Sequence, residues 1–130
     1  YGDGVADIDI NKLLEFHKSK NKLVTLTSIQ PMSRFGIIEF DQNHTVKSFK
    51  EKPKLEGWIN GGFFVAEKGV FNYIEGDEDV FEQKPLTKLA QEGKLTAFPH
   101  TGFWECMDTF KDTSRLNHMW DQKKAFWKVW

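Results

Sequence analysis

Segments with helical patterns and segments with strand patterns alternate along this chain, and one antiparallel hairpin interrupts the alternation. Residues 10–19 repeat apolar side chains at helical spacing after Asp9, which is expected to cap the helix. Residues 23–29 alternate in polarity and predict a strand, and residues 36–40 and 45–49 flank a short polar turn and predict the hairpin. The alternation predicts an α/β fold, and the hairpin favours a mixed sheet over a purely parallel one.

The rest of the chain continues the same alternation. Residues 59–66 predict a strand with an interior Gly61-Gly62 pair. The final helix is expected to begin at Asp108 or Thr109 and to run towards Lys123, with Phe110, Leu116, Met119 and Trp120 on its core side. Between the strand over 59–66 and the final helix we expect helices over 70–74 and 80–92 and strands over 95–98 and 103–107.

Size and charge exclude several classes of protein. A chain of 130 residues without a linker or repeat predicts one domain. The net charge of −1 argues against a general nucleic-acid or membrane-surface binder, because such proteins carry an excess of basic residues. No apolar run approaches the ~20 residues of a membrane span. The single cysteine, Cys106, excludes an internal disulfide and favours a cytoplasmic protein.

Two acidic residues stand at the ends of predicted elements. Asp3 lies between two glycines in Tyr1-Gly2-Asp3-Gly4, and α/β proteins place ligand contacts where a carboxylate leaves a strand into such a loop just before a helix. The letters alone nevertheless favour an ordinary Asp-Gly turn over a metal or phosphate site. Asp108 follows an apolar strand pattern at the start of a helix, where it could be a helix cap or a partner of Asp3 in holding a divalent cation. Cys106 is expected to be a small core residue.

Two further stretches are candidates for binding a phosphorylated ligand. In Glu51-Lys52-Pro53 the proline ends a strand, and only at a strand end can two neighbouring side chains reach the same site. The lysine would then contact a phosphate, and the glutamate would accept hydrogen bonds from hydroxyl groups. The alternative is a solvated, charged hairpin edge. In Asn60-Gly61-Gly62 the glycines would let a ligand approach the backbone closely, and the side-chain amide of Asn60 could form hydrogen bonds with sugar hydroxyls. The alternative for this stretch is a β-bulge.

Seven stretches, taken in order, resemble the second half of the glucose-1-phosphate cytidylyltransferase family, a branch of the sugar-phosphate nucleotidyltransferases. They are YGDGVADI, SRFGIIEF, FKEKPK, WINGGFF, FEQKPLTKLAQEGKLTAF, TGFWECMDTFKD and KAFWKVW. The resemblance implies the C-terminal half of a Rossmann-like, GT-A-like nucleotidyltransferase fold. It also implies transfer of a cytidylyl group from CTP to glucose 1-phosphate, which gives CDP-glucose for deoxysugar pathways.

The resemblance further implies roles for individual residues. Asp3 and Asp108 would ligate Mg²⁺, and Lys52 would contact the sugar phosphate. Glu51 and Asn60 would contact the glucose hydroxyls. Gly36 would offer its backbone to the sugar, and Gly61 and Gly62 would let the strand approach it. Asp3, Lys52 and Asp108 would thus be the catalytic set, while the role of Arg34 stays open.

The family's nucleotide-binding loop, of the type Gly-Gly-x-Gly-Thr-Arg, does not occur in these 130 residues. The resemblance therefore implies that residues 1–130 form the sugar-phosphate- and metal-binding part, with the N-terminal nucleotide-binding part absent. A homo-oligomer is expected, with no nucleic-acid or membrane partner. The alternatives are a thymidylyl- or uridylyltransferase of the same superfamily and a non-catalytic module that binds sugar phosphates.

Overall fold

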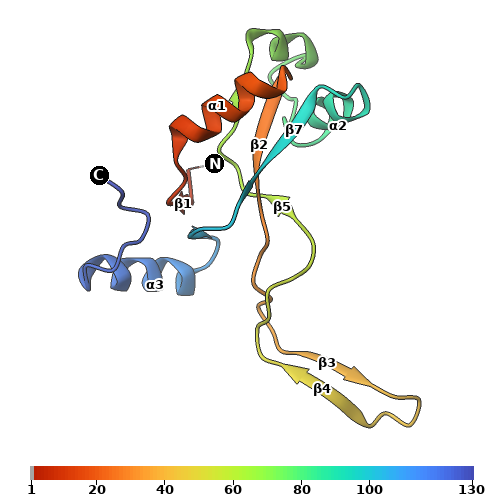
Figure 1. Ribbon diagram of the computed structural model, residues 1–130, viewed down its shortest axis with the longest axis vertical. Helices are drawn as coiled ribbons and strands as arrows, with labels where there is room; N and C mark the ends of the chain where they lie inside the picture. The colour runs from red at the N-terminus through yellow and green to blue at the C-terminus, as the bar shows by residue number, and fades with distance from the viewer. Residues whose placement is uncertain (1) are drawn as a thin grey trace.

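The computed structural model describes residues 2–130 and shows a mixed α/β architecture (Figure 1). Within these residues no helix combines the length and apolar character needed to cross a membrane. In chain order the elements are β1 (Gly4–Ala6), α1 (Ile10–Lys20), β2 (Val24–Ile29), β3 (Ile37–Phe40), β4 (Val46–Lys50), β5 (Ile59–Asn60), β6 (Val65–Ala66), the 3₁₀ helix η1 (Lys68–Tyr73), α2 (Lys84–Gln91), β7 (Leu95–His100), β8 (Trp104–Cys106) and α3 (Phe110–Asp121).

Strand β2 is the centre of the largest sheet. On one side β7 runs parallel to it, with Val24 opposite Leu95 and Ile29 opposite His100. On the other side β5 and β6 pair with it antiparallel, near its end and its start respectively. Five of the six β2 residues are buried, as expected of a strand with neighbours on both edges. The predicted mixed sheet is confirmed.

The core lies where α2 and η1 pack against the start of this sheet. Val24, Val70, Tyr73, Leu86 and Leu89 form one buried cluster. Helix α1 also contacts β2 and β7, and α1 and α2 both lie beside the upper part of these strands in Figure 1. The side chain of Asp9 caps α1 as predicted, since its Oδ1 accepts a hydrogen bond from the Lys12 amide at 3.1 Å.

A second, smaller ladder joins the first strand to the last. β1 pairs antiparallel with β8, with Gly4 opposite Cys106 and Ala6 opposite Trp104. The Met107 amide also donates to the Asp3 carbonyl at 2.9 Å, which extends the pairing by one residue beyond the strand ends. The two segments are about a hundred residues apart in sequence, so this ladder brings the distant residues Asp3 and Asp108 to one of its ends.

The predicted hairpin forms and projects away from the rest of the chain as β3 and β4 (Figure 1). The loops on either side of it also pair, through a bridge between Met32 and Lys54 and a bond from the Ser33 amide to the Pro53 carbonyl. We call residues 31–58 the arm. Its large apolar side chains are exposed, with Phe35 at 77% and Phe49 at 63%.

Three predicted elements were wrong in their bounds or type, and Phe110 was wrong in its orientation. The strand over 59–66 is interrupted after Asn60 and resumes at Val65. The helix over 80–92 begins only at Lys84, where Pro85 is suited to the first turn, and the helix over 70–74 is a 3₁₀ helix from Lys68 to Tyr73. Phe110 does not face the core, because it is 89% exposed in the first turn of α3.

Candidate functional site

A cavity of about 470 Å³ opens where the β1–β8 ladder meets the interrupted strand. Three segments that are distant in sequence supply its walls: the start of β1, the stretch between β5 and β6, and the end of β8 with the residues after it. The lining residues are Asp3, Gly4, Asn60, Gly61, Gly62, Phe63, Phe64, Trp104, Cys106 and Asp108. Five of the residues given a role from the sequence are therefore brought together here, namely Asp3, Asn60, Gly61, Gly62 and Asp108.

The two carboxylates lie at the same end of the β1–β8 ladder. Asp3 immediately precedes β1 and Asp108 follows β8 by two residues. Because the strands are antiparallel, the start of one lies beside the end of the other. Asp3 was expected to leave a strand and instead enters one, but the ladder still places it at the cavity together with Asp108.

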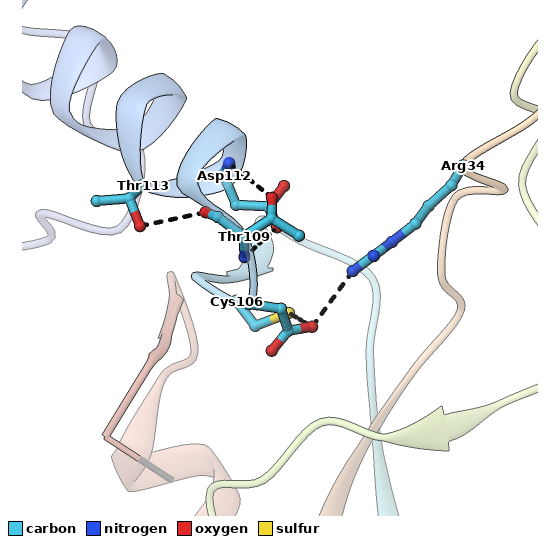
Figure 2. Close-up of polar contacts among 6 residues, drawn as sticks. Arg34, Cys106, Thr109, Asp112 and Thr113 are labelled. Atoms are coloured by element: carbon cyan, nitrogen blue, oxygen red, sulfur yellow. Dashed lines mark hydrogen bonds and ion pairs between the residues drawn. The ribbon is translucent and has the colours of Figure 1, made fainter.

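Asp108 is not the cap of α3. That role belongs to Thr109, whose Oγ1 accepts from the Asp112 amide at 3.2 Å while the Asp112 carboxylate accepts from the Thr109 amide at 3.1 Å (Figure 2). The Thr109 hydroxyl also donates to the Asp112 carboxylate at 2.8 Å, and this bond, together with the one from the Thr109 amide, holds the pKa of Asp112 below its usual value. The alternative that Asp108 serves only as a helix cap is therefore excluded.

Two side chains hold the Asp108 carboxylate instead. Arg34 reaches it from the arm, with Nη2 at 3.3 Å from Oδ2, and the Cys106 thiol donates to the same oxygen at 3.0 Å (Figure 2). Asp108 and Arg34 are both about half exposed or more, so the ion pair is screened by water and is weak in itself. The pair between Arg34 and Asp108 nevertheless brings the arm into contact with the acidic side of the cavity.

The opposite wall is the stretch between β5 and β6. A Cβ at Gly61 would lie 3.1 Å from Ile29 and 3.2 Å from the Thr27 carbonyl, so a side chain here would push its neighbours apart by a few tenths of an ångström. Gly62 and Phe63 then adopt left-handed backbone angles, with φ of 75° and 47°. Asn60 Oδ1 accepts from the Gly62 amide at 3.0 Å and stabilises this turn. The glycines thus interrupt the strand where it lines the cavity, and the segment forms neither a continuous strand nor a simple bulge.

Gly36, Glu51 and Lys52 do not line this cavity. They lie together near the base of the arm, where Glu51 and Lys52 pair at 3.4 Å and the Glu51 carboxylate is 3.0 Å from the position of a Cβ on Gly36. Lys52 has a left-handed backbone with φ of 44°, immediately before Pro53. Such strain in a non-glycine residue is typical of functional positions. Arg34, from the same end of the arm, is the residue that connects this group to the cavity.

Three residues near the site were missed by the sequence reasoning. Arg34 had no assigned role, and Trp104 and Thr27 were treated as ordinary strand residues. The indole Nε1 of Trp104 donates to the Gly61 carbonyl at 2.8 Å, and Thr27 contacts the same segment from β2. The sequence holds no local signal for these contacts, because each joins residues more than 30 positions apart.

Burial raises the pKa of the Cys106 thiol to about 11, and the hydrogen bond to Asp108 adds to the effect. Because the thiolate is the reactive form, alkylation by iodoacetamide at pH 8 should be about a hundredfold slower than for a free cysteine. Asp108→Asn removes the negative charge and should lower the pKa, so alkylation at pH 8 should become faster. The rate is measured from pH 7 to 11 by mass spectrometry. Equal alkylation rates for the wild-type protein and the Asp108→Asn variant would show that Asp108 does not raise the pKa of the Cys106 thiol.

Comparison with known proteins shows the family of this chain. The family described as nucleotidyl transferase matches residues 1–124. The chain belongs to the nucleotidyl transferase family. Among curated nucleotidyl transferases, it is 50% identical to "Glucose-1-phosphate cytidylyltransferase" of Salmonella typhi and 49% identical to the protein of that name in Salmonella typhimurium. Both comparisons cover 100% of this chain and 51% of the relative, so the chain spans about half the length of these curated relatives.

A solved structure described as a putative glucose-1-phosphate thymidylyltransferase from Bacillus anthracis has the same fold, with a TM-score of 0.61 and 20% identity over 91% of this chain and 51% of its own. The structure of HddC from Yersinia pseudotuberculosis matches 92% of this chain and 52% of its own, with a TM-score of 0.62 and 23% identity. At this identity the match concerns the fold alone. The expected fold is thereby confirmed: the sheet is mixed, and the chain matches about half of the length of these two structures.

Proposed function

We propose that this chain forms the sugar-phosphate- and metal-binding part of a glucose-1-phosphate cytidylyltransferase, with residues 1–130 acting as one unit. In the proposed reaction a phosphate oxygen of glucose 1-phosphate attacks the α-phosphorus of CTP, and pyrophosphate leaves as CDP-glucose forms. The observation that carries the proposal is the cavity, because two acidic residues, a glycine-rich backbone segment and an asparagine line it together. The 50% identity to the Salmonella typhi relative supports the choice of substrates.

The acidic wall suits a magnesium ion. Carboxylate oxygens are ligands that Mg²⁺ prefers, and Mg²⁺ near phosphates is commonly held by one or two carboxylates together with substrate oxygens and water. Asp3 and Asp108 meet that requirement, and within residues 2–130 no group of three or more His, Cys, Asp and Glu forms a fuller metal cage. We therefore assign Asp3 and Asp108 as the residues that would hold Mg²⁺. When bound, the ion would neutralise charge that develops on the nucleotide phosphates.

The remaining residues position the sugar phosphate. Asn60 and the Gly61 backbone would contact glucose hydroxyls from the wall of the cavity, and Glu51 would contact hydroxyls from the arm. Lys52 would pair with the sugar phosphate and reduce its repulsion from the nucleotide, while Gly36 would present its backbone to the sugar. The attacking phosphate oxygen is already ionised at pH 7, so no general base is needed. Positioning and charge neutralisation account for the rate in such reactions.

The test uses a chimera in which this chain replaces the segment that it matches in the Salmonella typhi relative. The chimera should form CDP-glucose and pyrophosphate from CTP, Mg²⁺ and glucose 1-phosphate. The 130-residue chain alone, which lacks the Gly-Gly-x-Gly-Thr-Arg loop, should form neither product. Release of pyrophosphate is followed by a coupled phosphate assay. A folded chimera that binds glucose 1-phosphate but transfers nothing would favour the non-catalytic module.

We also propose a homo-oligomer, in which the exposed apolar side chains of the arm are covered by another copy. Phe35, Ile38, Phe40 and Phe49 are each at least half exposed, and exposed patches of this kind commonly mark contacts between chains. Sedimentation velocity of the chain should show larger species as the concentration rises. A single monomeric species at high concentration would contradict this part of the proposal.

A further inference from the structure

The glycine-rich wall of the cavity is not held by regular strand pairing. The segment from Asn60 to Phe63 lies between two short strands and contains two consecutive left-handed residues. Left-handed conformations cost free energy for a residue such as Phe63, so this shape persists only where surrounding contacts fix it. The conformation of the Asn60–Phe63 segment therefore depends on the residues that contact it.

On one side the contacts come from Thr27 of β2, a fully buried residue. The Thr27 carbonyl accepts from the Gly61 amide at 2.8 Å, its amide donates to the Gly62 carbonyl at 3.0 Å, and its hydroxyl donates to the Phe63 carbonyl at 3.1 Å. One threonine thus makes a hydrogen bond to each of three successive residues of the wall.

On the other side the contact comes from Trp104 of β8. Its Nε1 donates to the Gly61 carbonyl at 2.8 Å. Side chains two apart on a strand point to the same face, so Trp104 shares a face with Cys106, and both line the cavity together with Asp108. The rigid indole therefore joins the glycine-rich wall to the strand that leads to the acidic wall, and fixes the spacing between them.

We propose that Thr27 and Trp104 are positioning residues that clamp the Asn60–Phe63 segment in the conformation that recognises the sugar. This inference rests on the proposed function, because it takes the ligand of the segment to be the sugar of a hexose 1-phosphate. Loss of either contact leaves a buried backbone carbonyl without its partner and lets the segment adopt other shapes. The sugar then binds with an affinity reduced by the fraction of molecules in the correct shape.

The test measures kinetics in the Salmonella chimera. Trp104→Phe keeps the aromatic volume and removes the donor, and Thr27→Val removes the hydroxyl at nearly constant volume. Each variant should raise KM for glucose 1-phosphate about tenfold, with little change in KM for CTP. Each should also reduce the preference, in kcat/KM, for glucose 1-phosphate over galactose 1-phosphate, which a general loss of stability would not do. Trp130→Phe, at an exposed tryptophan, is the matched control and should change neither.

A second measurement examines the contact in the 130-residue chain itself. The indole N–H of Trp104 should exchange with D₂O more slowly than that of Trp130, as followed by ¹⁵N-resolved NMR with signals assigned from the Trp→Phe variants. Fast exchange at Trp104 would overturn the inference. So would an active chimera in which both clamp variants retain the original KM and the original sugar preference. If Trp104→Phe does not fold, Thr27→Val decides the kinetic test. A wild-type chimera without activity would instead count against the proposed function.

Discussion

Replacing Asp3 with asparagine in the Salmonella chimera should lower kcat for CDP-glucose formation by about a thousandfold. The substitution keeps the size of the side chain and removes one of the two carboxylates at the cavity. Stabilisation of charge by a bound metal contributes several kcal/mol to a transition state, and ~4 kcal/mol corresponds to that factor in rate. The rate is measured by pyrophosphate release at saturating CTP and glucose 1-phosphate.

Asp108→Asn should have a comparable effect, and the double variant should be little worse than either single one, because the two carboxylates would act as one unit. Each single variant should also require a higher Mg²⁺ concentration for half-maximal rate. Asp41→Asn is the matched control, since this carboxylate lies in the hairpin, where it accepts from the amides of Asn43 and Thr45 and pairs with Lys47 at 3.0 Å, and it does not line the cavity. A kcat within threefold of wild type for Asp3→Asn would remove Asp3 from the proposed metal site.

The elements with strong local patterns could be predicted from the sequence. Helix α1, strand β2 and the β3–β4 hairpin occur within one or two residues of their expected positions, because capping, alternation and turn residues act over a few positions. The interrupted strand at Gly61 and Gly62 was missed for a non-local reason. Its backbone is held by Thr27 and Trp104, which lie 34 or more residues away in sequence. Nothing within the segment itself indicates those partners.

The site was predictable in the same partial way. Asp3 and Asp108 were paired on the resemblance and on their similar settings, and the antiparallel β1–β8 ladder supplies the physical reason for their proximity. The placement of Glu51 and Lys52 depends on how the arm lies relative to the cavity, and this is a property of tertiary contacts such as the pair between Arg34 and Asp108. Propensity and spacing carry no information about such contacts.

Leu89→Ala should lower the free energy of unfolding of the 130-residue chain by about 3 kcal/mol. Leu89 is fully buried and packs with Val24, Val70 and Leu86, so truncation removes apolar contacts and leaves a void. The change is measured by urea denaturation, where the midpoint should fall while the slope stays constant. Leu14→Ala on α1, at a side chain that is 38% exposed, is the matched control and should cost less than about 1 kcal/mol.

This core is connected to the site through β2. Val24, at the start of β2, packs in the same cluster as Leu89, and Thr27 of β2 forms hydrogen bonds with the glycine-rich wall. If the core and the wall form one cooperative unit, Leu89→Ala should speed amide exchange at Gly61 and Gly62 by the same free energy that it removes from global unfolding. Equal midpoints for the Leu89→Ala and Leu14→Ala variants would contradict the assignment of Leu89 to the core. Unchanged exchange at the glycines would show instead that the wall opens independently of the core.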